Sequence, residues 1–542
     1  MIVSDTEYGL VEAALEGQLS RRDLIKGLLA AGLSLTAVSG ILSEVGLGAV
    51  EAAPAPKPKR GGTLRVGYLV PASDTDPVRF FNEGAILTGQ TALEYLCYPR
   101  PNYTLEPKLA TSWHASKPDT WTFHLRKGVK WHDGSPFTAD DVVATFNRLT
   151  DPAVNSAALS AYKGILSKGN TKKVNAHTVT FHLDRGYVDF PYLVSAFTYN
   201  ALILPKNYQI GDFVKGGIGT GPYILTKYTP KVGATFKKNP HYWAKGIPYL
   251  NGVELKFYGD TQAVALAMQG GAIDAFPNIP PGTQNLYTSS NLKILRNPAS
   301  SYREFHMRVD KKPFNDKRVR QAVALSLDRP KLIQGLLHGY GRVGNDHAFA
   351  PVYPLSVITK KIPQRKQNYT QAKKLLAAAG HSRGFAVTLT TENYLEIPSY
   401  ATVIKQQLKG AGIDVNLNVE DQSTYYGQGS NQPWLDVPMG IVDWAPRGVP
   451  SQTITPAYLT GAVWNSAHWS NKTYDHLISA SDKELSKTKR EQMVLRAARI
   501  QHDAVPAVIA YWVDDLSVVR KNVHGFPKGP SSYPDLSHVW IG

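Results

Sequence analysis

The stretch of sequence that decides the fold is Trp121-Thr-Phe-His-Leu-Arg-Lys-Gly-Val-Lys-Trp-His-Asp-Gly-Ser-Pro-Phe-Thr-Ala-Asp-Asp-Val142. Its first five residues place Trp121, Phe123 and Leu125 on one face, which predicts a strand. Residues 132–136, His-Asp-Gly-Ser-Pro, are typical of a turn. A capping box over 138–141 then precedes an apolar stripe that continues to Leu149, which predicts a helix.

The same two periodicities recur on both sides of this stretch. Period-two alternation predicts strands at 62–70, 178–183, 223–225 and 413–419. Helical spacing predicts helices at 262–268, 316–327, 370–376 (capped by Thr370) and 399–408. Because strands and helices alternate along the chain, we expect the α/β class.

The composition is that of a large globular protein. The chain has 542 residues, of which 43% are hydrophobic, and this exceeds what one compact core usually holds, so we expect two or more lobes. Cys97 is the only cysteine, which excludes an intramolecular disulfide, and its apolar neighbours predict a buried side chain. The formal charge of +17 comes from scattered Lys and Arg residues without a basic stripe. We therefore expect a solvated basic surface and no nucleic-acid partner.

The N-terminal segment has the layout of an export signal. Arg21-Arg22 precede a mildly apolar run from Gly27 to about Val50, and small residues follow up to Ala53. The paired arginines resemble a twin-arginine signal. We expect a signal peptide at 1–53, a linker at 54–61 and a mature protein in the periplasm. A permanent membrane anchor is the alternative, since the run is long enough to span a bilayer.

Signatures of catalysis are missing from the sequence. It contains no G-x-S-x-G, no H-E-x-x-H and no phosphate-binding loop of the G-x-x-x-x-G-K type. Residues 216–221 resemble a dinucleotide-binding loop, but Pro222 takes the place of the last glycine and a strand follows. Most histidines stand alone. We therefore expect no catalytic residue, no metal site and no cofactor.

The deciding stretch resembles the hallmark segment of the family 5 extracellular solute-binding proteins, the peptide and nickel type. Further elements of that family follow in the same order and extend the resemblance from about residue 62 to 515. They are Leu105–Trp113, Gly219–Tyr223, Asn239–Trp243, Pro313–Ala322 and Ala372–Gly380.

The resemblance implies a large two-lobed clamp of the periplasmic binding-protein kind, with mixed sheets. Lobe I would comprise 62–300 plus 515–542, lobe II would comprise 301–514, and two crossovers would form the hinge. A protein of this kind captures a small solute without catalysis and delivers it to the transmembrane subunits of an ABC permease. Closure would be a ligand-biased equilibrium between two states. We expect the chain to be a monomer.

The resemblance also points to a ligand-binding stretch around Asp443. In peptide-binding members an aspartate in the matching stretch pairs with the α-ammonium of the peptide, and a carboxylate in a closed cleft binds an amine strongly. This chain departs from the pattern: Gly440-Ile441 replace the usual Trp, and Pro446-Arg447 replace an acidic-Pro pair. A plain dipeptide ligand is therefore in doubt. The alternative for Asp443 is a loop residue that caps its own backbone.

Further candidate ligand-binding residues come from segments expected at the cleft: Trp444, Arg447, Tyr302, Arg303, Asp346, His347, Asn82 and Trp434. The expected ligand is an oligopeptide or a related amphipathic solute. An opine, a sugar derivative or a metal chelate is an open alternative. A secreted hydrolase and a periplasmic chaperone or sensor partner are the competing classes of function.

Overall fold

The computed structural model describes residues 10, 13, 21–30, 38, 57–71, 75–216, 218–427, 431–529 and 533–542. Two units are distinguished, residues 1–58 and 59–542. The first unit contains the helix α2, Arg21–Ala30. Most of the predicted signal peptide, including the side chains of its paired arginines, lies outside the described residues. In the described part of the chain, no helix is both long and apolar enough to cross a membrane.

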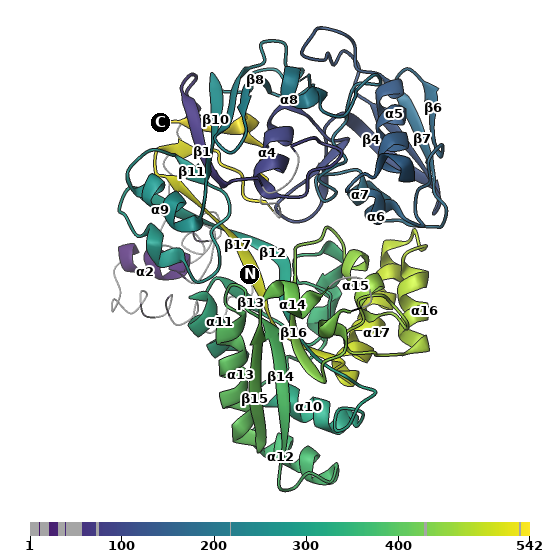
Figure 1. Ribbon diagram of the computed structural model, residues 1–542, viewed down its shortest axis with the longest axis vertical. Helices are drawn as coiled ribbons and strands as arrows, with labels where there is room; N and C mark the ends of the chain where they lie inside the picture. The colour runs from purple at the N-terminus through teal and green to yellow at the C-terminus, as the bar shows by residue number, and fades with distance from the viewer. Residues whose placement is uncertain are drawn as a thin grey trace. The chain divides into compact units, whose positions relative to one another are not determined.

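The second unit is organised around one long mixed sheet, which the described residues form from 11 strands. Figure 1 shows strands of both halves of the chain joined through β12 and β17. The order is β15-β14-β16-β12-β17-β11-β1-β10-β9-β8, and β13 also pairs with β17. In that order the bounds are Ile413–Glu420, Phe385–Glu392, Met439–Trp444, Leu292–Met307, Ala507–Arg520, Ala275–Phe276, Thr63–Leu69, Gly252–Tyr258, Gly233–Lys238 and Tyr223–Thr229, with β13 at Gly341–Val343.

The two central strands, β12 and β17, run antiparallel to each other through the middle of this sheet. Their register shifts between Asn297 and Ser301 and again between Tyr302 and Glu304. Extra residues in one strand of a pair bend it and increase its twist. The predicted lobe boundaries, 300/301 and 514/515, fall inside these two strands.

The deciding stretch folds as predicted, in a second sheet with the order β4-β5-β7-β6. Its strand is β5, Thr120–Leu125, and its helix is α5, Ala139–Leu149. The Thr138 amide donates to Asp141 Oδ2 at 2.8 Å, as a capping box requires. Trp121, Phe123 and Leu125 are buried in the core, so this stretch is scaffold. The other strands are β4 (Ala110–Lys117), β7 (Thr178–His182) and β6 (Thr171–Asn175).

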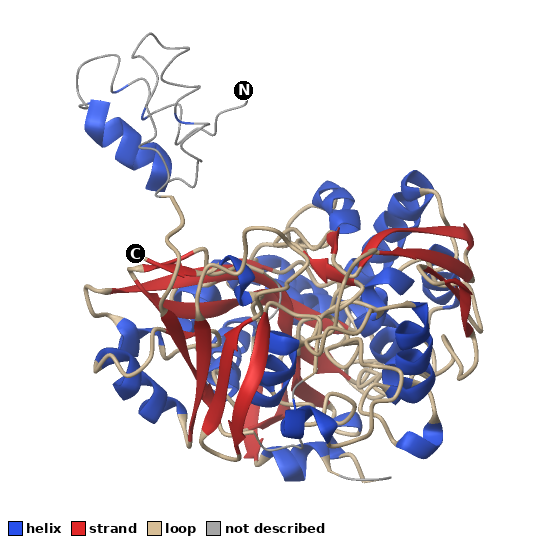
Figure 2. Ribbon diagram, turned by 90° about the horizontal axis from the view of Figure 1, so that it is seen from above, coloured by secondary structure: helices blue, strands red, loops and turns tan. Residues whose placement is uncertain are grey.

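The remaining predicted helices form within a few residues of their expected ends, and Figure 2 shows helices packed around the strands. One cap is wrong: α12 begins after Asn368, whose side chain accepts from the Gln371 amide, and Thr370 lies inside the helix. Cys97 is buried, as expected. The longer helices are α4 (Glu83–Ala92), α9 (Thr261–Gln269), α10 (Lys317–Leu325), α11 (Arg329–Leu337), α12 (Tyr369–Ala378), α13 (Ile397–Ala411), α15 (Ser451–Tyr458), α16 (Lys472–Ser481) and α17 (Lys487–Ala504). Shorter ones are α6 (Leu159–Tyr162), α7 (Phe190–Leu193), α8 (Asp212–Gly216) and α14 (Gln422–Tyr426).

The apolar core divides between the two halves of the chain. The largest cluster draws nearly all its members from 64–257, together with a few residues of β11, β12, β17 and the C-terminal segment. In the other half, alternate residues of β16 enter two different clusters: Met439 and Ile441 enter one, Val442 and Trp444 the other. Both faces of that part of the sheet are therefore covered, which leaves the ends of its strands as the place where polar side chains gather.

Candidate ligand-binding site

Asp443 lies directly opposite Arg303, in the register that pairs β16 with β12. The stretch around Asp443 is therefore a strand of the central sheet, not the loop that the sequence suggested. The buried Arg303 guanidinium forms an ion pair with Glu396, with 2.9 Å from Nε to Oε1. Burial lowers the pKa of Arg303, but Glu396, Tyr511 and Asp443 together raise it above its usual range. Arg303 is thus neutralised mainly by Glu396.

A second carboxyl group, Glu392, stands behind Asp443 at the end of β14. The Tyr426 hydroxyl lies 2.7 Å from Glu392 Oε1 and 2.8 Å from Asp443 Oδ1. Gln422 donates to Glu392 Oε2 at 2.6 Å. Burial and the field of Asp443 raise the pKa of Glu392 to about 7. The Tyr426 hydroxyl therefore joins the two carboxyl groups.

Two more acids come from outside residues 301–514. Glu83 opens α4 and accepts from Asn278 Nδ2 at 2.5 Å. Asp515 lies on β17, and its Oδ2 is a buried atom without a hydrogen-bond partner among the described residues. Burial, then Glu83 and Asp514, raise the pKa of Asp515 to about 8 against the opposing fields of Arg342 and Arg303.

Tyr394 connects the two pairs of acids. After burial, Asp443, Glu83 and Glu392 all raise the pKa of its hydroxyl, and Arg303 lowers it. Three carboxyl groups and Arg303 therefore act at one side chain, and Asp515 is linked to them through Glu83 and Arg303. We refer to Glu83, Glu392, Asp443 and Asp515 as the acidic cluster. Its members come from α4, β14, β16 and β17 and are linked by electrostatic interactions with one another or with Tyr394.

Arg447 is a further predicted residue, and its backbone is fixed to β12. Its amide donates to Ser300 Oγ at 2.8 Å, and that hydroxyl donates back to the Arg447 carbonyl at 2.9 Å. These bonds fix the segment after β16 to the bulged part of β12. Burial raises the pKa of Tyr533, Glu83 and Asp515 raise it further, and the charge of Arg447 lowers it. Of the predicted residues, Asp443 is thus a member of the acidic cluster, Arg303 lies opposite it, and Arg447 acts on Tyr533 together with Glu83 and Asp515.

Tyr302 and Trp444 point to the opposite face of the sheet. Their rings stack at 6.3 Å, and Tyr302 packs edge-on against Trp512 at 4.9 Å. The Trp444 indole donates to the buried Glu304 at 2.9 Å. Both side chains are buried in the core. The structure gives them a packing role, away from Asp443.

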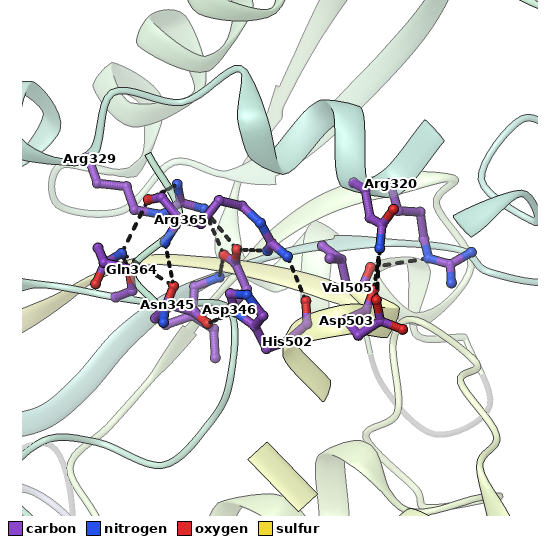
Figure 3. Close-up of polar contacts among 12 residues, drawn as sticks. Arg320, Arg329, Asn345, Asp346, Gln364, Arg365, His502, Asp503 and Val505 are labelled. Carbon is purple, nitrogen blue, oxygen red and sulfur yellow. Dashed lines mark hydrogen bonds and ion pairs between the residues drawn. The ribbon is translucent and has the colours of Figure 1, made fainter. Parts of the chain in front are cut away.

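Asp346 lies outside the cluster, in a buried ion network with Arg329 and Arg365 (Figure 3), and His347 is the buried residue that follows it in the chain. Asp346 is fully buried, and it accepts from Arg329 at 2.8 Å and also pairs with Arg365. Those two arginines lower the pKa of Asp346 although burial acts to raise it. Burial lowers the pKa of His347 to about 4, so this imidazole is neutral at neutral pH.

The last two predicted residues support the cluster indirectly. Asn82 caps α4, because its side-chain oxygen accepts from the Ala85 amide at 3.2 Å, and this places Glu83 at the first helical position. Trp434 is buried and packs edge-on against Tyr426 at 5.8 Å. It therefore holds the hydroxyl that joins Glu392 to Asp443.

Glu83, Glu392, Glu396, Tyr426 and Asp515 were not predicted from the sequence. One signal was available for Asp515: adjacent acids, Asp514-Asp515, interrupt the apolar run of 507–519. A charged residue within an apolar strand must be paired or functional. The others lie at the ends of ordinary strands and helices and gave no such signal.

The comparisons with known proteins agree with this architecture. The family "Bacterial extracellular solute-binding proteins, family 5 Middle" matches residues 104–466. The oligopeptide-binding protein AppA of Bacillus subtilis is 28% identical over 512 residues, which cover 88% of this chain and 90% of AppA. The glutathione-binding protein GsiB of Escherichia coli is 26% identical over 421 residues, which cover 75% of this chain and 80% of GsiB.

Solved structures show the same fold. The periplasmic binding protein DppA of Helicobacter pylori, in complex with the peptide STSA, superposes with a TM-score of 0.69 at 21% identity, covering 89% of this chain and 98% of DppA. The fold is therefore the two-lobed α/β fold with mixed sheets that these binding proteins share. The chain belongs to the family 5 bacterial extracellular solute-binding proteins, and it functions as the substrate-binding component of a bacterial ABC importer.

Proposed function

We propose that the captured solute carries a positive charge, and that it is an oligopeptide or a related amphipathic solute bound through an ammonium group. The observation that carries this proposal is the acidic cluster: its carboxyl groups act on one another or on shared neighbours, and Arg303, which interacts with Asp443 and Asp515, already forms an ion pair with Glu396. An ammonium group at Asp443 would supply the positive charge that no ion pair among the described residues gives this carboxyl group. Charge-assisted hydrogen bonds of this kind are about twice as strong as neutral ones.

The relatives support the same ligand class. AppA is an oligopeptide-binding protein and GsiB a glutathione-binding protein, and both kinds of ligand carry an α-ammonium group. We propose that the chain binds its solute without transforming it and acts as a monomer that delivers it to the permease. The lobes would be 62–300 plus 515–542 and 301–514, with the bulged part of β12 and β17 as the hinge between them.

Export completes the proposal. We propose that residues 1–53 are removed after transport by the twin-arginine route, so that the mature protein acts in the periplasm. Replacing both Arg21 and Arg22 by Lys should then retain the protein in the cytoplasm in a fractionation experiment. Unchanged export of that variant would reject the twin-arginine route and leave the binding function untouched.

The binding experiment compares trialanine with N-acetyl-trialanine, which lacks the ammonium group. We expect trialanine to raise the melting temperature of the mature protein and the acetylated form to have no effect, because only the former can pair with Asp443. Asp443→Asn should weaken trialanine about 10- to 100-fold, the range for a hydrogen bond to a charged group. The matched control is Asp414→Asn, the same change at an exposed carboxylate on β15.

Equal shifts with both peptides would refute an ammonium site. If neither peptide binds, native mass spectrometry of the purified protein identifies a carried solute, and a solute without a basic nitrogen would refute the proposal. If the carried solute is an opine or a sugar derivative that contains an amine, the proposed ammonium site stands and the peptide is rejected as the ligand.

A further inference from the structure

The contacts of Tyr426 require one more hydrogen than the tyrosine can supply. Its hydroxyl oxygen is within hydrogen-bond distance of two carboxyl oxygens, at 2.7 Å from Glu392 and 2.8 Å from Asp443. A phenol has a single O–H and can donate to only one of them. If both carboxyl groups were ionised, the other contact would bring lone pairs of two oxygens together. A proton on one carboxyl group turns that contact into a hydrogen bond.

Arg303, the positive charge that acts on Asp443, does not remove this requirement, because it is already paired with Glu396. Among the described residues, neither Glu392 nor Asp443 forms an ion pair with Lys, Arg or His within 4.0 Å, because Arg303 pairs with Glu396. From α14, Gln422 and Tyr426 face Glu392 as neutral groups. The remaining charges that act beside them, Glu304 and Glu420, are acidic and raise the pKa of the adjacent Tyr425 together with Glu392.

We infer that Glu392 and Asp443 share one proton through Tyr426 in the ligand-free protein, and that a cation bound at Asp443 displaces this proton to solvent. Glu392 is fully buried and is thus a positioning residue that sets the charge of Asp443. The charges balance: the pair goes from a charge of −1 to −2 as the ligand brings +1, and one proton leaves. The displacement by a ligand rests on the proposed function, whereas the shared proton does not.

The first test needs no ligand. The protein is labelled with ¹³C at the side-chain carboxyl of glutamate, and the Glu392 resonance is identified by its loss in Glu392→Gln. The matched control Glu491→Gln changes an exposed glutamate and should leave the titrating signal in place. Geometry and the raised pKa predict a midpoint near 7 for Glu392. Tyr426→Phe should move the midpoint further up, because it removes a hydrogen bond that favours the charged form.

The second test measures the proton directly. Trialanine amide, a cation without a carboxylate, is titrated calorimetrically at about pH 6 in two buffers of different ionisation enthalpy. A midpoint near 7 predicts release of about 0.9 proton per bound ligand at that pH, and an affinity that rises about 5-fold between pH 6 and 7, where the α-amino group of the ligand stays protonated. In Glu392→Gln the proton release should vanish, and the affinity should become independent of pH over this range.

The two tests separate the two ideas. A Glu392 carboxyl that stays ionised from about pH 5 to 9 would overturn the shared proton, whatever the ligand does. Binding of trialanine amide without proton release would overturn the displacement and leave the ammonium site standing. If trialanine amide fails to bind while Glu392 titrates near 7, the shared proton stands and the proposed ligand class falls.

Discussion

Replacing Asp346 by Asn should destabilise the protein strongly without changing its affinity for ligand. Asp346 is fully buried and faces two guanidinium groups, those of Arg329 and Arg365, both of which are nearly excluded from solvent. Its backbone has a φ of +56°, a conformation that Asn tolerates as readily as Asp. The substitution therefore keeps shape and backbone and removes only the negative charge between two buried cations.

The magnitude follows from this geometry. Removing one partner of a buried ion pair costs about 3–5 kcal/mol, because the other charge stays buried and unpaired. That is a large fraction of a total stability of about 5–15 kcal/mol. The control is Asp503→Asn, the same change in the exposed pair with Lys317 at 2.8 Å, which should cost less than about 1 kcal/mol. Figure 3 shows both aspartates.

The assay is urea unfolding followed by tryptophan fluorescence, with the same slope expected for all three proteins so that the midpoints report stability. A difference of less than about 1 kcal/mol between Asp346→Asn and Asp503→Asn would refute the reasoning from burial. A loss of ligand affinity in Asp346→Asn at unchanged stability would instead restore the sequence-based prediction that Asp346 contacts the ligand.

Three further substitutions test other parts of the structure by the same unfolding assay. Gly440→Ala should cost about 1–3 kcal/mol, because the added Cβ would lie 2.5 Å from His306 Cε1 in a buried site, and a neutral outcome would mean that this site has spare room. Arg490→Gln should cost about 3 kcal/mol, since it leaves the buried Asp189 without its partner at 2.6 Å, and a loss below 1 kcal/mol would place that pair in effective contact with solvent. Because the pKa of Glu392 is raised, this carboxyl group does not lower the free energy of unfolding below about pH 4.5, and it lowers that free energy by its full amount above about pH 7. The free energy of unfolding of Glu392→Gln relative to wild type should therefore rise by about 2.5 kcal/mol from about pH 5 to about pH 8. Parallel pH profiles of stability for the two proteins would contradict the raised pKa.

The sequence determined the scaffold of this protein. The strand, turn and helix of 121–149 formed as predicted, and so did the capping box at Thr138, because periodicity, turn residues and caps act over a few neighbouring residues. The ordered family motifs identified the family for the same reason: they are short segments whose local structure the sequence specifies. The cap assigned to Thr370 shows the limit of this method, since boundaries are uncertain by one or two residues.

The site was decided by the tertiary structure. Asp443 and Arg303 were both candidates, but only the pairing of β16 with β12 makes them neighbours. Glu392 and Tyr426 join them from separate elements, and nothing in their local sequence marks them. The sequence predicts a ligand contact at Asp346, whereas the structure buries this residue between Arg329 and Arg365, which reach it from other segments. Local sequence specifies which side chains share a face of one element, whereas burial and charge at a site depend on which distant elements meet there.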